Sequence, residues 1–295
     1  MFVVVESGST KADWMVITSG EEKAYSTKGF NPYFHSKQDI LIELNDHLEL
    51  DLIKGEVKEL YFYGAGCSSS ELNKIIENGL KAFFINAKIT VSHDLSACAY
   101  ACYNGVSEIA CILGTGSNSC FYDGNEVHEE LPALGHILGD EGSGSYFGKR
   151  LLADFLYGKL PAPLHQELIG KGLNSARIIE NVYRKSNANV YIASFMPALV
   201  RHKELEYSQS LIKKGFKKFI DTHVKCYSNY KQCEVNFVGS LADLLQEELI
   251  AVCEESNITV GRIIRRPLDN LVSYHKNKQG MAQKSLSAKD IDQLN

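Results

Sequence analysis

Three glycine-containing turns, each directly after an apolar run, are the feature of the sequence best suited to binding a charged ligand. Glycine lets the backbone approach a ligand closely, and successive N–H groups in such a turn form a concave site for an anion. Neighbouring Ser and Thr hydroxyls add neutral donors. Because the turns are spread over both halves of the chain, they favour a nucleotide held between domains. They are Glu6-Ser7-Gly8-Ser9-Thr10, Gly114-Thr115-Gly116-Ser117-Asn118 and Val238-Gly239-Ser240-Leu241.

Two carboxylates lie where they could serve phosphoryl transfer, which needs a group that accepts a proton and a magnesium ion that offsets phosphate charge. Asp94 follows an expected strand, Lys88–Ser92, and opens a helix, the position where an α/β sheet presents catalytic groups. A simple helix N-cap is the alternative interpretation of Asp94. Glu6 ends a strand that should be buried, where a carboxylate is costly unless it faces a metal or water. We therefore expect Glu6 near magnesium, through water more often than directly.

Further polar residues stand among glycines and in turns. Asp140 and Glu141 lie between Gly139 and Gly142, so they could bind sugar hydroxyls or magnesium, or begin a helix whose dipole favours acids. Asn31 precedes a proline and could hydrogen-bond a hydroxyl or acetamide, although Asn-Pro is also an ordinary turn. His136 invites a catalytic role, but a structural histidine is at least as plausible an interpretation.

Composition excludes several classes of partner. The chain has 295 residues, a formal net charge of −5, and 44% hydrophobic residues. The negative charge argues against nucleic acid, and no apolar run approaches the ~20 residues that span a bilayer. The N-terminal run Met1–Val5 lacks the basic start of a signal peptide. Since the eight cysteines form no Cys-x-x-Cys pair, we expect free thiols in a cytoplasmic protein without a membrane segment.

The expected elements follow an α/β pattern that restarts in mid-chain. A β-rich opening with strands near Phe2–Glu6, Trp14–Ile17 and Lys23–Thr27 is followed by helices, and a second β-rich opening begins at Glu108. Each opening contains a Gly-Ser turn, a weak signal of two related domains. The second half is predicted to be more helical. Its predicted helices are Glu141–Tyr157, Ser175–Lys185, Asn189–His202, Glu206–Tyr230 and Asp243–Glu255.

At these motifs the chain resembles the actin-like ATPase superfamily, and within it the BadF/BadG/BcrA/BcrD ATPase family and N-acetylglucosamine kinases. The resemblance covers most of the chain. It is most specific in Leu113–Asn118 and Gly135–Ser143.

The resemblance implies an α/β fold of two duplicated actin-like (ribonuclease H-like) domains. Each domain is a mixed five-stranded sheet with flanking helices, and ATP lies in the cleft between them. The expected domains are residues 1–106, joined by a C-terminal helix at 280–295, and residues 107–279.

The family pattern also assigns roles to residues. It implies that Thr10 and Thr115 contact the nucleotide phosphates, with Gly8, Ser9 and Gly116 in the same turns. Gly239 and Ser240 would contact the far side of the nucleotide. Asp94 matches the catalytic base and also touches the sugar. The remaining sugar-binding positions are Asn31, Ser117, Asn118, Gly135, His136 and Asp140.

The implied function is ATP- and Mg²⁺-dependent phosphorylation of a hydroxyl of a small sugar, N-acetylglucosamine or a related amino sugar, by in-line transfer. Leu134 stands where the familiar kinase has an aromatic residue, and Ser7 and Ser9 replace glycines of the first turn. A non-catalytic sugar or nucleotide sensor, or an ATPase acting on a protein partner, are the alternatives. A homodimer is compatible with the resemblance.

Overall fold

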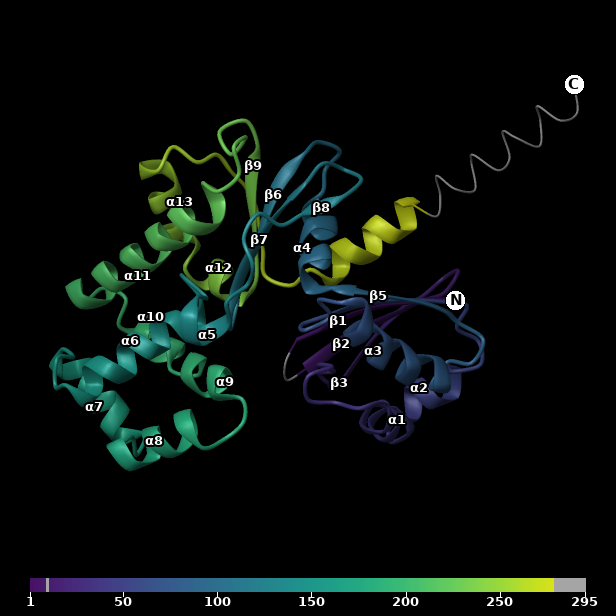
Figure 1. The fold of residues 1–295 in the computed structure, drawn as a ribbon, viewed down its shortest axis with the longest axis horizontal. Coiled ribbons are helices and arrows are strands. Elements are labelled where there is room, and N and C mark those ends of the chain that lie inside the picture. The colour runs from purple at the N-terminus through teal and green to yellow at the C-terminus, as the bar shows by residue number, and fades with distance from the viewer. Residues whose placement is uncertain (9–10, 279–295) are drawn as a thin grey trace, which may run out of the picture. The chain divides into compact units, whose positions relative to one another are not determined.

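The computed structural model describes residues 1–8 and 11–278 (Figure 1). The chain divides into two compact units. Unit 1 contains Met1–Ala101 and the described residues from Pro267 to Lys278, and unit 2 is the continuous segment Cys102–Arg266. Residues 267–278, which the sequence assigned to the second domain, thus belong with unit 1. The helix expected at 280–295, Ser9 and Thr10 lie outside the described residues.

Unit 1 is built on a five-stranded mixed sheet in the order β3-β2-β1-β4-β5. β1 pairs antiparallel with β2 and parallel with β4, so the strand that carries the first turn is central. The strands are β1 (Phe2–Ser7), β2 (Lys11–Ile17), β3 (Glu22–Lys28), β4 (Glu59–Gly64) and β5 (Lys88–His93). The helices are α1 (Lys37–Asn45), α2 (Leu48–Ile53), α3 (Ser70–Phe83) and α4 (Asp94–Cys102), followed after unit 2 by a helical stretch at residues 268–278.

The apolar residues of β1 explain its central position. Val3 and Val5 are fully buried against one cluster of core side chains, whereas Val4 is fully buried in another. Successive side chains of a strand point to opposite faces, so both faces of this sheet are covered. α1 and α3 pack on each other, and a Cβ on Gly79 would lie only 2.9 Å from the Ile40 side chain. The sheet therefore holds the end of β1 between two packed layers.

Unit 2 repeats this sheet. Its order is β10-β9-β6-β7-β8, with β6 antiparallel to β7 and parallel to β9. Numbered within each unit, both sheets have the order 3-2-1-4-5. The strands are β6 (Glu108–Leu113), β7 (Ser117–Tyr122), β8 (Val127–His128), β9 (Glu234–Val238) and β10 (Val260–Ile264). The expected fold class, two duplicated units with mixed five-stranded sheets and flanking helices, is confirmed.

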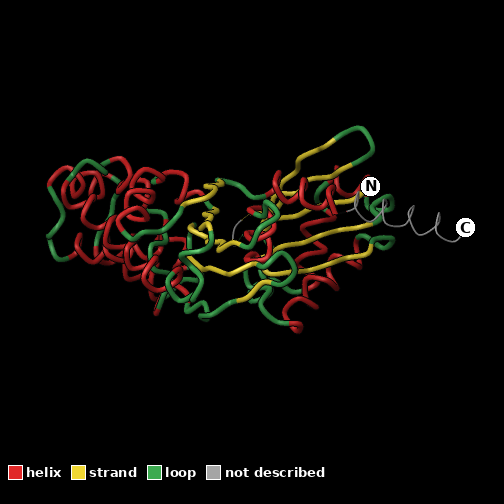
Figure 2. Tube along the Cα trace, turned by 90° about the horizontal axis from the view of Figure 1, so that it is seen from above, coloured by secondary structure: helices red, strands yellow, loops and turns green. Residues whose placement is uncertain are grey.

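Between β8 and β9 the chain forms helices only, which Figure 2 shows in red. Their apolar faces and the sheet form one buried core that includes Phe147, Phe216 and Phe237. The helices are α5 (Gly135–Leu138), α6 (Gly144–Leu156), α7 (Ala162–Gly170), α8 (Ser175–Tyr183), α9 (Ala188–Ala193), α10 (Met196–Arg201) and α11 (Glu206–Phe219), the last continuing as a π-helix, η1 (Ile220–Val224). After β9 come α12 (Ser240–Leu244) and α13 (Gln246–Glu255).

Several expected elements were wrong at their boundaries. The helix expected at Glu206–Tyr230 leaves α-helical geometry at Ile220 and ends its π-helical turn at Val224. The helix expected at Asn189–His202 is split into α9 and α10, because Pro197 has no N–H to continue the first helix. None of the helices in the described part of the chain is long and apolar enough to cross a membrane.

A buried carboxyl group lies inside the sheet of unit 2. Glu108 on β6 is 1% exposed, and its Oε2 accepts a hydrogen bond of 2.9 Å from Asn236 Nδ2 on β9. Its Oε1 is buried without a hydrogen-bond partner among the described residues. Burial raises the pKa of Glu108 to about 8. The carboxyl group is therefore protonated in the folded chain at neutral pH but ionised once the chain unfolds.

The raised pKa predicts a pH dependence of stability. Because the folded state holds a proton that the unfolded state releases, stability is greatest below the ordinary pKa of 4.5 and falls as pH rises toward 8. The variant Glu108→Gln should not lose stability in this way, and its free energy of unfolding should exceed that of wild type by up to about 4 kcal/mol near pH 8. Urea unfolding followed by circular dichroism at about pH 5 and pH 8 measures the free energy of unfolding of both proteins.

The exposed Glu126, in the turn between β7 and β8, offers a control. Glu126→Gln should unfold with the wild-type pH dependence. Equal pH dependence in wild type and Glu108→Gln would show that the Glu108 carboxyl group is already ionised in the folded chain.

Candidate active site

In unit 1 the first glycine turn follows β1 and is joined to two neighbouring segments. The Ser7 hydroxyl accepts a hydrogen bond of 2.8 Å from the Phe30 N–H, and the Ser7 carbonyl accepts one of 3.0 Å from the Ala65 N–H. Gly8 N–H donates to the Lys11 carbonyl across the turn. The chain before Asn31 and the end of β4 are thereby fixed beside the turn. Of this turn, Ser9 and Thr10 fall outside the described residues.

Asn31 lies buried in this group, and its side chain is engaged locally. Its Oδ1 accepts a hydrogen bond of 3.0 Å from the Tyr33 N–H, and its own N–H donates to His35 Nδ1 at 3.1 Å. Gly66 has a φ of 83°, and a Cβ there would lie 2.7 Å from Asn31 Oδ1. The absence of a side chain at Gly66 thus leaves room for the Asn31 amide. Its Nδ2 donors are the groups that a ligand could use.

Asp94 is the first residue of α4, directly after β5, as the sequence predicted. Its side chain is 30% exposed, and its Oδ1 lies 3.1 Å from His93 Nδ1. Burial raises the pKa of Glu6 to about 7, with further contributions from the negative charges of Asp94 and Asp13. Within unit 1 the carboxyl groups of Glu6, Asp13 and Asp94 thus share one electrostatic environment.

This group of oxygens suits a magnesium ion, which prefers carboxylate and water ligands. A nearby divalent cation would also relieve the repulsion that raises the pKa of Glu6. In residues 1–8 and 11–278, however, no group of three or more His, Cys, Asp or Glu side chains could hold a metal ion. A magnesium ion at this group would therefore have to be held largely through water molecules, with few direct protein ligands.

In unit 2 the second glycine turn is tighter than the sequence predicted. Ser117 pairs with Leu113 in the β6–β7 register, so Ser117 and Asn118 belong to β7 and the turn is Gly114-Thr115-Gly116. Backbone hydrogen bonds of 2.8 and 2.9 Å run from the N–H groups of Gly144 and Ser145 to the carbonyls of Gly114 and Thr115. The first residues of α6 thus hold the backbone of the turn in place through two hydrogen bonds.

Asp140 completes this support. Its Oδ1 accepts a hydrogen bond of 3.3 Å from the Ser117 N–H, and its Oδ2 accepts one of 3.1 Å from the Ser145 hydroxyl. Its backbone is left-handed, with a φ of 57°, which non-glycine residues rarely adopt and which asparagine and aspartate tolerate better than most. A Cβ on Gly116 would lie 3.1 Å from the same carboxylate. The Asp140 carboxylate therefore joins the β7 end of the glycine turn to the start of α6.

The third glycine turn lies beside the second in the same sheet. Gly239 follows β9, which pairs parallel with β6, and Gly114 follows β6. A Cβ on Gly239, whose φ is 130°, would lie 2.3 Å from the Leu113 carbonyl oxygen, so only glycine fits here. Ser240 begins α12. Two of the three glycine turns thus lie at the carboxyl ends of adjacent parallel strands, the edge where α/β sheets bind ligands.

Two of the residues that connect this turn to η1, Ser119 and His223, were not singled out from the sequence. The Ser117 hydroxyl donates to the Glu141 carbonyl at 2.7 Å, and Glu141 Oε2 lies 3.2 Å from His223 Nε2 in the π-helix. Ser119 Oγ donates to the His223 carbonyl at 2.6 Å. π-helical turns occur frequently at functional sites, but their onset leaves no pattern in the sequence that predicts them.

The other predicted sugar-binding residues of unit 2 are Asn118, Gly135 and His136. Asn118 adjoins Ser117 and Ser119 on β7, and the other two lie in the short helix before Asp140. Asn118 Oδ1 accepts from the Ser119 N–H at 2.9 Å, and Asn118 Nδ2 donates to Glu129 at 3.4 Å. Gly135, with a φ of 66°, begins the short helix α5, which contains His136. Lys149 Nζ donates to the His136 carbonyl.

Comparison with solved structures decides the family. A crystal structure from Porphyromonas gingivalis, described as a "Putative N-acetylglucosamine Kinase", matches with a TM-score of 0.89 and 33% sequence identity, over 95% of this chain and 100% of that one. The chain belongs to the same family as that protein. No family model and no curated protein sequence matches the present chain.

More distant structures support the fold alone. A protein from Chromobacterium violaceum, also described as a "Putative N-acetylglucosamine Kinase", matches with a TM-score of 0.70 at 14% identity over 93% of this chain and 99% of that one. A ROK hexokinase from Thermus thermophilus matches with a TM-score of 0.51 at 12% identity over 92% and 97%. The actin-like fold of sugar kinases is therefore shared, while the roles of individual site residues stay predictions.

The support of the second turn by Asp140 can be tested by substitution. Asp140→Ala removes both accepted hydrogen bonds and strains a left-handed backbone, so it should lower the unfolding free energy by about 2–3 kcal/mol. Asp140→Asn keeps one hydrogen-bond acceptor, and asparagine adopts the left-handed backbone readily. This variant should therefore lower the unfolding free energy by only about 1 kcal/mol. In Asp140→Ala, hydrogen exchange at the Ser117 and Ser145 amides should accelerate.

Asp123 provides a matched control, because its Oδ1 also accepts two hydrogen bonds of 2.7 Å, from the N–H groups of Asn125 and Glu126. Asp123→Ala should accelerate exchange in its own hairpin turn and leave Ser117 unchanged. If Ser117 exchanges at the wild-type rate in Asp140→Ala, the carboxylate does not support the turn.

Proposed function

We propose that the chain transfers the terminal phosphoryl group of ATP to a hydroxyl of a small sugar, N-acetylglucosamine or a related amino sugar. The observation that carries the proposal is the full-length relationship at 33% identity to a protein described as a putative N-acetylglucosamine kinase. The glycine turns and the acidic group around Asp94 support it. Membership of the BadF/BadG/BcrA/BcrD branch of the superfamily is part of the same proposal.

Unit 2 is proposed to bind the nucleotide. The turn at Thr115 and Gly116 offers backbone N–H groups and a hydroxyl to phosphate oxygens, and Gly239 and Ser240 lie at the end of the adjacent strand. Thr10, with Gly8 and Ser9, is proposed to add contacts from unit 1. Ser117, Asn118, Gly135, His136 and Asp140 are proposed to line the sugar site from unit 2.

Unit 1 is proposed to bind and activate the acceptor. Asn31 would hydrogen-bond the sugar, and the Asp94 carboxylate would accept a hydrogen bond from the reacting hydroxyl. As the oxygen–phosphorus bond forms, Asp94 takes the hydroxyl proton, and the bond from the terminal phosphorus to the bridging oxygen breaks to release ADP. Glu6, with Asp13 nearby, is proposed to hold Mg²⁺ through water, and the ion would offset the charge of the phosphates.

The proposal predicts the effect of one conservative change. Asp94→Asn keeps size and hydrogen-bonding capacity but cannot accept the proton, so turnover should fall by roughly 10²–10⁴-fold while affinity for ATP and sugar changes only a few-fold. A coupled assay of ADP release with N-acetylglucosamine measures turnover, and calorimetry measures both affinities.

Asp269→Asn, an exposed aspartate in the helical stretch at 268–278, is the control and should retain wild-type turnover. Unchanged turnover in Asp94→Asn would exclude Asp94 as the base. A panel of neutral and amino sugars identifies the acceptor. Binding without sugar-stimulated ADP release would favour a sensor, and ADP release without sugar would favour an ATPase.

A further inference from the structure

A pocket of about 380 Å³ lies on unit 2. It is lined by residues of α5, of α6 and of the end of α11, and by Gly139 and Glu141 from the segment between α5 and α6. Its lining includes three basic side chains, Lys149, Arg150 and Lys218, and a single carboxylate, Glu141. The chain as a whole carries a formal net charge of −5. A pocket with a local excess of positive charge therefore stands out against the composition.

The basic groups gather around one aromatic ring. The Arg150 guanidinium lies 6.0 Å and the Lys218 ammonium 5.9 Å from the centre of the Tyr146 ring. Burial holds the pKa of Lys149 below its usual range; the charges of Asp140 and Glu141 oppose this lowering, whereas those of Arg150 and Lys218 add to it. Bringing like charges together has a free-energy cost, which an anion bound among them would offset.

The charges inside the pocket are only partly compensated. Lys218 lies 3.3 Å from Glu141 Oε1, and Lys149 donates to the His136 carbonyl. Glu141 also contacts His223, so its charge is shared between two partners. Arg150 has no ion pair or hydrogen bond to any residue in the described part of the chain. Its guanidinium fork is the group best placed to bind an incoming anion.

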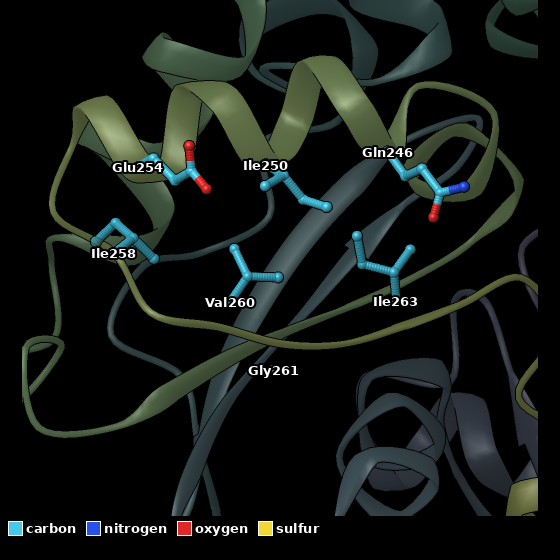
Figure 3. A pocket seen from close by; sticks show the side chains of 7 residues that line it. All are labelled: Gln246, Ile250, Glu254, Ile258, Val260, Gly261 and Ile263. Carbon is cyan, nitrogen blue, oxygen red and sulfur yellow. The ribbon is translucent and has the colours of Figure 1, made fainter.

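A second pocket of unit 2, between α13 and β10, lacks the cluster of basic side chains and serves as a comparison. Figure 3 shows Ile250, Val260 and Ile263 in its wall, with Gln246 and Glu254 as the polar side chains. It has no lysine or arginine in its lining. The gathering of cations thus distinguishes the pocket at α5 and α6 from this one.

We propose that the pocket beside Tyr146 binds a small phosphate monoester, at a site separate from the proposed nucleotide-binding turns. A phosphate monoester carries nearly two negative charges at neutral pH, which matches the excess charge of the pocket better than a single carboxylate does. Guanidinium and ammonium groups are the usual protein partners of phosphate. The organic part of the ligand would lie against Ile137 and Leu138, each 75% exposed in the pocket wall.

The pocket also adjoins the support of the second glycine turn. Glu141 lies in the pocket wall, its carbonyl accepts from Ser117, and its neighbour Asp140 holds the same turn. An anion that draws Lys218 away from Glu141 would change the electrostatic surroundings of this segment. Exchange at the Ser117 amide therefore serves as a second readout of binding.

The test uses the full-length chain with two probes, inorganic phosphate and glucose 6-phosphate, and isothermal titration calorimetry. Arg150→Gln should weaken binding of the sugar phosphate by about tenfold, because one charged hydrogen bond to phosphate is lost. Lys218→Gln should weaken it similarly. Lys217→Gln is the matched control, since Lys217 is the neighbouring residue on α11, pairs with Asp221 and does not line the pocket. Thermal unfolding confirms that each variant is folded.

Retention of wild-type affinity in both Arg150→Gln and Lys218→Gln would overturn the proposal, and so would absence of binding to wild type. Saturating ATP distinguishes the sites. Binding that persists beside ATP supports a separate site, whereas complete displacement by ATP would assign the anion to the nucleotide site and overturn the proposal. Failure here leaves the kinase assay of Asp94→Asn unaffected, so the two proposals are tested independently.

Discussion

The arrangement of unit 2 depends on one carboxylate in an uncommon backbone conformation. Asp140 adopts a left-handed φ of 57° and from there accepts hydrogen bonds from Ser117 on β7 and Ser145 on α6. Burial raises the pKa of this carboxyl group, while both hydrogen bonds oppose the rise. The glycine turn, the strand that follows it and the first turn of α6 therefore hold a common geometry, and a ligand meets donors that are already fixed. Such preorganisation reduces the cost of ordering on binding.

The duplicated sheets give the two units comparable positions for chemistry but different side chains. In each unit the first strand is central and ends in a glycine turn. In unit 1 the turn is accompanied by the acidic group of Glu6, Asp13 and Asp94. In unit 2 it is accompanied by a second glycine turn and by neutral hydroxyls. The turn of unit 1 thus has three carboxyl groups near it, whereas the turn of unit 2 has the Asp140 carboxylate, held by two hydrogen bonds, together with these hydroxyls.

Much of the fold could be predicted from the sequence because strong local patterns specify it. The Val3–Val5 run predicts a buried strand, and Asp94 directly after β5 was expected at the start of a helix. The resemblance supplied the duplicated sheets. By contrast, α7 was missed, since prolines at 161 and 163 interrupt a helical pattern although they suit a helix start. β10 was missed because Gly261 and Arg262 break its apolar run.

The site was predictable only in part, because its supporting contacts join residues that are distant in sequence. The glycine turns and Asp94 could be selected from local patterns. The contact of Asp140 with Ser117 spans 23 residues and that of Glu141 with His223 spans 82, and no single-sequence pattern encodes either. The π-helical turn at Ile220–Val224 depends on packing around His223 and Phe219, which the helical periodicity of α11 does not reveal.

The division of the chain has a consequence for its synthesis. Unit 2 is one uninterrupted segment, whereas unit 1 includes His275, whose imidazole hydrogen-bonds Tyr63 from 212 residues away at 2.8 Å. On a ribosome, Met1–Ala101 is made before residues 268–278, so the core of unit 1 is complete only once those later residues have been added. Unit 2 can reach its folded state in that interval, and the nascent unit 1 meanwhile exposes the apolar surface around Tyr63 and Tyr100 that residues 268–278 later cover.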